Sequence, residues 1–333
     1  MSAAGTPEHT LLDTHEGVLR EAGAALATRV YYSRYPDSPS PRVYGEGAAD
    51  AGRAAYERRL ASQFTGLADQ PSDGTWVGDE VSPFGPVLGV SYPGLDVPAA
   101  LAAATSAMRG WRDAGPQVRA AVCVEIIDRV NAASFEIAHA VMHTSGQPFV
   151  MAFQAGGPNA QDRALEAVVA ALVEQERVPE RAVWERPGRA GTVRMEKDYR
   201  VVPRGIGLVI GCNTFPTWNA YPGLFASLAC GDAVIVKPHP RAVLPLAITV
   251  EVARTVLSEA GFDPAVVQLA AEGSGGRLAA ELAMRPEVAL VDYTGGPAFG
   301  QWLVEHAGAR GASVFAEKAR AASAARSRSP SAV

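Results

Sequence analysis

The sequence predicts an α/β protein built on a doubly wound parallel sheet. Short apolar runs rich in β-branched residues recur along the second half of the chain, and each is followed by a segment with helical spacing. The clearest unit predicts a strand over 205–210, a helix over 217–229 and a second strand over 233–236. Two buried strands joined by a helix form a right-handed parallel unit, and ligands bind beyond the carboxyl ends of such strands.

The same alternation continues to the end of the second half. The predicted elements are a helix over 244–260, a strand over 266–270, a Gly273-Ser274-Gly275-Gly276 turn that opens a helix to 284, a strand over 288–293, a helix over 298–307 and a strand over 313–316. Glycines at 231 and 261 are the predicted helix stops. Strands that alternate with helices are typical of a doubly wound sheet.

The first half reads as helices and an extended arm. Helices are predicted over 11–32, 48–59, 98–114, 116–142 and 159–175, with a Gly- and Pro-rich arm over 70–97 and a hairpin over 192–202 that turns at 196–198. The predicted organisation is an N-terminal extension (1–97), a helical part (98–190), the hairpin region (191–203), the parallel sheet (204–319) and a tail (320–333).

Composition indicates a soluble protein of a reducing compartment. The chain has 333 residues, 48% of them hydrophobic, and a net charge of -5. A mildly acidic chain gives no reason to expect a nucleic acid or an anionic membrane as partner. We see neither a membrane-spanning apolar stretch nor a signal peptide, and three cysteines do not suggest a disulfide framework. We therefore predict a cytoplasmic protein.

The tail 320–333 contains only Arg, Ala, Ser, Pro and Val. It lacks periodicity and aromatic residues, so we expect it to be disordered. Two alternatives stay open for this tail: an Arg-Ser segment that binds RNA, or the out-of-frame translation of a GC-rich gene.

Five segments of the second half follow the pattern of a known superfamily. They are Gly205-Ile206-Gly207, Cys212-Asn213-Thr214-Phe215-Pro216, Cys230 to Pro238 (CGDAVIVKP), Tyr293-Thr294-Gly295-Gly296 with Gly300, and Glu317. Their order and spacing resemble the aldehyde dehydrogenase superfamily over roughly residues 100–320. Within it, the segments SPFGPVLGVSYP and CNTFPTWNAYP are similar to the phenylacetic acid degradation protein PaaN group.

The resemblance implies a reaction class. In this superfamily a cysteine thiolate adds to an aldehyde, hydride passes to NAD(P), and water cleaves the resulting thioester. It implies a small-molecule aldehyde as substrate, a homo-oligomer as assembly and, for the PaaN group, a place in phenylacetic acid catabolism.

Lys237 matches the family lysine that hydrogen-bonds the adenosine ribose. Many members have a glutamate three residues later that holds the 2′-hydroxyl, but here that place is Pro240, while His239 and Arg241 add positive charge. A carboxylate would repel a 2′-phosphate. Its absence from this place predicts NADP, rather than NAD, as the preferred cofactor.

Thr294, Gly295, Gly296 and Gly300 match the turn where the family's cofactor passes the start of a helix. Glycines allow the backbone to approach closely, and a helix N-terminus presents free N–H groups to phosphate. The turn that begins at Gly273 offers similar chemistry, so all five positions are predicted to bind cofactor.

The predicted catalytic residues are Thr214, Asn213 and Glu317. Thr214 matches the family asparagine whose amide contributes to the oxyanion hole, and Asn213 is a neighbouring donor. Glu317 matches the general base that activates the deacylating water.

The nucleophile has no match in this chain. In the family it lies in a catalytic domain beyond the glutamate, and no cysteine follows Glu317 here. We expect Cys123 and Cys230 to be structural, whereas Cys212 lies on the cofactor side but matches a proline. The expectation is a truncated, inactive chain that lacks the catalytic domain. The alternative is a non-catalytic fragment that binds dinucleotide or a partner.

His139 and His143 lie four residues apart on a predicted helix, which is a spacing compatible with metal binding. No glutamate follows the first histidine and no third ligand is indicated, so no metal site is predicted.

Overall fold

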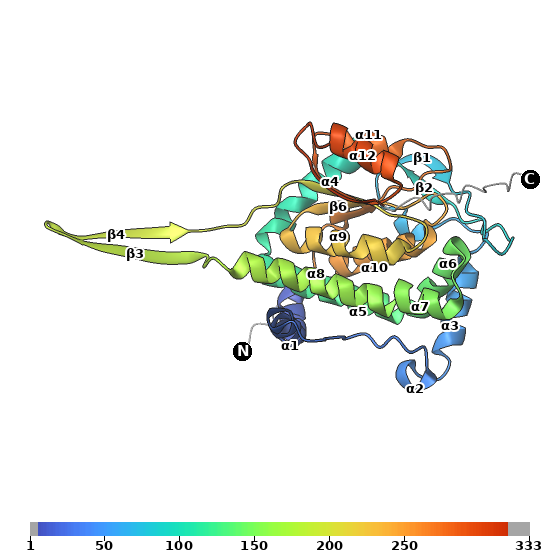
Figure 1. The fold of residues 1–333 in the computed structure, drawn as a ribbon, viewed down its shortest axis with the longest axis horizontal. Helices are drawn as coiled ribbons and strands as arrows, with labels where there is room; N and C mark the ends of the chain where they lie inside the picture. The colour runs from blue at the N-terminus through green and yellow to red at the C-terminus, as the bar shows by residue number, and fades with distance from the viewer. Residues whose placement is uncertain (1–5, 319–333) are drawn as a thin grey trace, which may run out of the picture.

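The computed structural model describes residues 6–318, and its centre is a five-stranded sheet with helices on both faces (Figure 1). The strand order is β7-β6-β5-β8-β9, and neighbouring strands are parallel throughout. The bounds are β5 Ile206–Ile210, β6 Ala233–Lys237, β7 Val267–Leu269, β8 Val288–Gly295 and β9 Ser313–Lys318. The chain leaves β5 toward β6 and β7 and returns on the other side to β8 and β9, which confirms the doubly wound sheet.

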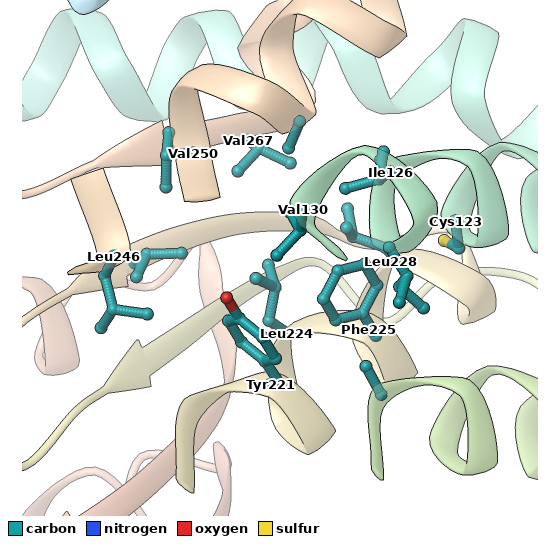
Figure 2. Close-up of a cluster of buried hydrophobic side chains, with 14 of the residues drawn as sticks. Cys123, Ile126, Val130, Tyr221, Leu224, Phe225, Leu228, Leu246, Val250 and Val267 are labelled. Atoms are coloured by element: carbon teal, nitrogen blue, oxygen red, sulfur yellow. The ribbon is translucent and has the colours of Figure 1, made fainter. Parts of the chain in front are cut away.

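One face of the sheet is covered by α9 (Pro216–Cys230) and α10 (Leu244–Glu259), with α5 (Pro116–Ala132) and α8 (Pro158–Glu176) packed outside them. Figure 2 shows the interior of this layer, where Tyr221 and Phe225 lie among aliphatic side chains. The other face is covered by α4 (Val97–Asp113), α11 (Leu278–Ala283) and α12 (Pro297–His306). Burial of this much apolar surface on both faces holds the sheet in the middle of the molecule.

The first part of the chain begins with a helix that packs against α5 and α8. Its elements are α1 (Pro7–Thr28), α2 (Pro41–Tyr44), α3 (Ala48–Arg59), η1 (Thr65–Leu67), β1 (Ser72–Val77) and β2 (Tyr92–Leu95). The buried Glu80 carboxylate accepts backbone N–H groups of Val243 at 2.6 Å and Leu244 at 3.1 Å, and the Tyr92 hydroxyl at 2.6 Å. The N-terminus of α10 is therefore capped by a residue of the extended arm.

Several helical predictions differ from the structure. The first helix was expected over 11–32 and is found over Pro7–Thr28, and α2 was not predicted. The expected helix over 116–142 is broken at Ala133, where the backbone leaves helical geometry, into α5 and α6 (Ser134–Ser145). A further helix, α7 (Phe149–Gly156), precedes α8 and was not predicted. The backbone of Ala133 makes a turn between two helices, and nothing as conspicuous as Pro or Gly marks this place in the sequence.

The hairpin lies earlier than predicted. It pairs β3 (Arg181–Gly188) with β4 (Gly191–Asp198) and projects away from the rest of the molecule (Figure 1). The predicted turn over 196–198 is wrong, because these residues pair across the hairpin with 181–183. The chain reverses between Gly188 and Gly191, where the positive φ of Gly191 suits glycine.

Within residues 6–318, no helix combines the length and apolarity that a membrane crossing needs. The tail 320–333, for which disorder is predicted, lies outside the described residues.

Candidate functional site

The carboxyl ends of the parallel strands bring most of the predicted site residues to one edge of the sheet. Asn213 and Thr214 follow β5, Lys237 ends β6, and Thr294 lies near the end of β8. Glu317 is next to the last residue of β9 and pairs in register with Thr294. The chain reverses its winding direction between β5 and β8, and such a switch point is where ligands of doubly wound sheets bind.

The turn after β5 is organised around a sulfur atom. The Asn219 amide of α9 donates to the Cys212 Sγ at 3.2 Å, and the Thr214 Oγ1 lies 3.5 Å from the same sulfur. The Gln147 amide donates to the carbonyl oxygen of Thr214. Thr214 itself is exposed at the rim of the edge. Asn219 is a second amide at this turn, and it is not among the site residues predicted from the sequence.

Lys237 is the buried cation of the edge. It is 3% exposed, its Nζ donates to the carbonyl oxygen of Pro238 at 3.0 Å, and it forms an ion pair with the Glu272 carboxylate. Burial lowers the pKa of Lys237, and Glu272 partly offsets this effect. Sequence reasoning missed Glu272, because its contact with Lys237 depends on the pairing of β6 with β7 and on no recognisable spacing.

Two backbone N–H groups at the turn that begins at Gly273 already donate hydrogen bonds to carboxylates of the chain. The backbone N–H of Ser274 donates to the Asp79 carboxylate at 2.9 Å, and that of Leu278 donates to Glu272 at 2.8 Å. These two N–H groups are the kind that would bind a phosphate, so their occupation weighs against a phosphate at this turn. Contact between Gly273 and a cofactor stays a prediction.

His239 and Arg241 follow Lys237 and lie nearer to solvent. The Arg241 backbone N–H donates to the His239 Nδ1 at 3.1 Å. Burial lowers the pKa of His239, and the positive charges of Arg241 and Lys237 lower it further. His239 is therefore mostly neutral near pH 7, and it contributes less positive charge than its sequence position suggests.

The turn before α12 leaves a helix N-terminus open. Gly296 is the N-cap residue, no side chain caps the helix, and open space surrounds the place of a Gly296 Cβ. The buried Gly300 has a different role, because a Cβ there would lie 2.9 Å from the Tyr293 ring and 3.1 Å from Lys318. Gly300 lets α12 pack closely on β8 and β9, while Gly296 keeps the first turn accessible.

Two carboxylates face the same side of β8 and β9. Glu317 is exposed, and Asp292 is largely buried beside Gly223 of α9, with no hydrogen bond to its carboxylate within residues 6–318. Burial and the nearby negative charge of Glu317 raise the pKa of Asp292 to about 6. Sequence reasoning missed Asp292, because it follows an apolar run of four residues within the strand and belongs to no recognised motif.

Two of the three cysteines are poor nucleophiles in their surroundings. Burial raises the pKa of both Cys123 and Cys230, so both remain thiols at neutral pH. The third, Cys212, is buried in the turn after β5.

No group of three or more potential metal ligands is found among residues 6–318. The His143 Nδ1 lies 3.0 Å from the Ser82 hydroxyl, and the rings of His139 and His143 both stack on Tyr56. These contacts account for the two histidines by packing and hydrogen bonding.

Comparison with models of known families shows which family the chain belongs to. The model of the aldehyde dehydrogenase family matches residues 93–320, which is more than half of the chain. The chain belongs to the aldehyde dehydrogenase family. The match includes all five strands of the parallel sheet and every predicted site residue.

Relatives match this aldehyde dehydrogenase family member over part of their length. Fluoroacetaldehyde dehydrogenase of Streptantibioticus cattleyicolor is 28% identical over 230 residues, covering 67% of this chain and 42% of the relative. The crystal structure of NAD-dependent aldehyde dehydrogenase from Burkholderia multivorans is 53% identical, with a TM-score of 0.90, covering 93% of this chain and 55% of that chain. The 1-pyrroline-5-carboxylate dehydrogenase from Thermus, at 20% identity and a TM-score of 0.67, shares the fold over 87% of this chain and 55% of its own. The chain thus spans about half the length of these relatives.

Proposed function

We propose that this chain forms the dinucleotide-binding part of an NAD(P)-dependent aldehyde dehydrogenase. The observation that carries the proposal is the gathering of Lys237, the open N-terminus of α12 and Glu317 on one edge of a doubly wound sheet. The resemblance of the sequence to this family and the description of the Burkholderia multivorans relative as NAD-dependent support it.

The residues at this edge fit a dinucleotide. Lys237 is held in place and can donate to ribose hydroxyls, and His239 and Arg241 lie beside it. Thr294, Gly295 and Gly296 precede the uncapped helix, whose free N–H groups suit a pyrophosphate. When bound, NAD or NADP supplies a hydride acceptor.

The chain's own residues would serve the aldehyde chemistry at the neighbouring strand ends. The exposed Glu317 is available as a general base for water, and Asn213 and Thr214 can donate hydrogen bonds to a developing oxyanion.

We also propose phenylacetic acid catabolism as the setting, which the segments 82–93 and 212–222 support by their resemblance to the PaaN group. Loss of growth on phenylacetate after deletion of the gene would test that setting. A cytoplasmic location fits the free thiols and is tested by cell fractionation.

The 333-residue chain by itself is expected to bind the dinucleotide without oxidising an aldehyde. Cys123 is buried and Cys230 partly buried, the pKa of each thiol is raised by burial, and Cys212 is engaged by the Asn219 amide. We would mix the chain with NAD or NADP and an aldehyde, and follow both binding by calorimetry and absorbance of the reduced nicotinamide. Binding without turnover is the expected result. Robust turnover that survives Cys212→Ser would refute the expectation of inactivity, and failure to bind either dinucleotide would refute the proposed function.

A second candidate is a non-catalytic, partner-binding role. Phe315 is 61% exposed on β9, which is an edge strand of the sheet, and an exposed edge strand can pair with another chain. A stoichiometric complex with an intact homologue, formed without turnover, would distinguish this role from that of a catalytic subunit.

We further propose that the chain forms a homo-oligomer through the β3–β4 hairpin. Every residue of the two strands is exposed, and Trp184 pairs with Met195 on one face, next to Val193. An isolated two-stranded hairpin is marginally stable, so a second copy that covers this face would stabilise it. Light scattering should give a multiple of the chain mass, and the double variant Trp184→Ser/Met195→Ser should lower it. An unchanged mass for the variant would contradict this assembly. Trp184 is 39% exposed and Met195 is 48% exposed, so neither substitution reaches the core.

A further inference from the structure

The cation at the end of β6 is matched by an anion from the neighbouring strand. Glu272 follows β7, and its side chain is 12% exposed, while that of Lys237 is 4% exposed. The Glu272 carboxylate also accepts the backbone N–H of Leu278 at 2.8 Å. Both charged groups therefore have fixed positions at the place where we propose that the adenosine ribose binds.

This carboxylate changes the expected chemistry of the ribose site. The NADP preference predicted above depended on Pro240 standing where a carboxylate is expected. In the structure a carboxylate reaches Lys237 from the β7 side instead. A carboxylate accepts hydrogen bonds from hydroxyl groups, but a phosphate carries one to two negative charges and has almost no proton to donate. Glu272 thus suits a free 2′-hydroxyl and repels a 2′-phosphate.

Other groups near the ribose site act in the same direction. The Asp79 carboxylate accepts the Ser274 N–H at 2.9 Å and so places a second negative charge at this turn, but Asp79 is exposed and water screens this charge as well. His239 is mostly neutral near pH 7, since burial and nearby cations lower its pKa. Arg241 and Arg277 are exposed, and water screens their positive charges.

We propose that Glu272, held against Lys237, makes this site select NAD over NADP by accepting a ribose hydroxyl and rejecting a 2′-phosphate. The inference rests on the proposed function, because it assumes that the dinucleotide binds at this edge. It assigns the cofactor preference to a residue that lies 35 positions beyond the lysine in the sequence.

Calorimetric titration of the 333-residue chain with NAD and with NADP tests the proposal without any need for turnover. The wild-type chain should bind NAD about tenfold more tightly than NADP, or better. Glu272→Gln keeps the shape and the acceptor for Leu278 but removes the charge, and should lower this ratio about tenfold. Glu281→Gln, an exposed position on α11, is the matched control and should leave the ratio unchanged.

Two additional measurements make the outcome decisive. Adenosine 5′-monophosphate and adenosine 2′,5′-bisphosphate differ only in the 2′-phosphate, so their affinities isolate its effect. The bisphosphate should bind more tightly to Glu272→Gln than to the wild-type chain. Asp79→Asn should shift the ratio in the same direction by a smaller factor, and it provides a second variant should Glu272→Gln fold poorly. Wild-type binding of NADP as tight as that of NAD, or an unchanged ratio in a folded Glu272→Gln, would overturn the inference alone. Binding of neither dinucleotide would overturn the proposed function and this inference with it.

Discussion

Replacing Lys237 with methionine should weaken binding of both NAD and NADP about 10- to 100-fold. The Lys237 Nζ is buried, donates to Pro238 and pairs with Glu272, so it is held in one position at the sheet edge. A hydrogen bond from a charged group of this kind contributes about 1.5–3 kcal/mol, which corresponds to the stated change in affinity. Methionine fills a similar volume without the charge. Calorimetric titration with each dinucleotide gives the dissociation constants directly.

The same substitution leaves the Glu272 carboxylate without its partner, so stability must be measured beside affinity. We expect Lys237→Met to lower the free energy of unfolding, because a partly buried charge loses its counter-ion. The double variant Lys237→Met/Glu272→Gln removes both charges and should recover stability without recovering binding. Lys197→Met on the exposed hairpin should alter neither quantity. A folded Lys237→Met variant with unchanged dissociation constants would remove Lys237 from the binding site.

The second large effect is a pH dependence of stability that comes from Asp292. The pKa of this carboxyl is 3.8 in its ordinary state and about 6 in the folded chain. Because the folded state holds the proton more tightly than the unfolded state, Asp292 stabilises the fold at low pH. This contribution is lost as pH rises through the interval between the two pKa values. It amounts to about 3 kcal/mol in full, of which about 1.5 kcal/mol lies between pH 5 and pH 8.

Urea unfolding of the wild-type chain and of Asp292→Asn at pH 5 and pH 8 measures this contribution. The variant keeps a similar shape but does not titrate, so its stability relative to the wild-type chain should increase by about 1.5 kcal/mol from pH 5 to pH 8. Asp13→Asn, an exposed position on α1, controls for the general effect of removing a carboxylate. The same stability difference at both pH values would show that Asp292 does not carry the expected shift.

The parallel sheet was predictable because its sequence signal is local. β5 and β6 are short apolar runs, each ended by a residue that is polar or glycine, and α9 ends at Gly231 in the left-handed conformation that glycine favours. The hairpin was misplaced for a local reason as well. The charged run 196–198 was interpreted as a turn, whereas the glycines at 188 and 191 provide the real reversal.

The groups that set the electrostatics of the site were not predictable in this way. Glu272 reaches Lys237 only through the side-by-side pairing of β6 and β7, and Asp292 becomes buried only because α9 packs across β8 at Gly223. Neither relationship leaves a fixed spacing in the sequence. Motif positions such as Lys237 and Glu317 could be assigned from resemblance, but their charged neighbours required the three-dimensional arrangement.

The hydrogen bonds of Glu80 determine where this protein can be truncated for expression. The family match begins at residue 93, and a cut placed there would delete the acid that caps α10 together with Tyr56, Phe64 and Leu67 from the shared interior. The shortened polypeptide would expose uncapped backbone N–H groups of α10 and apolar surface that is normally buried. We expect it to aggregate. The start of the family match at residue 93 therefore falls inside a single folding unit of this molecule and is not a domain boundary.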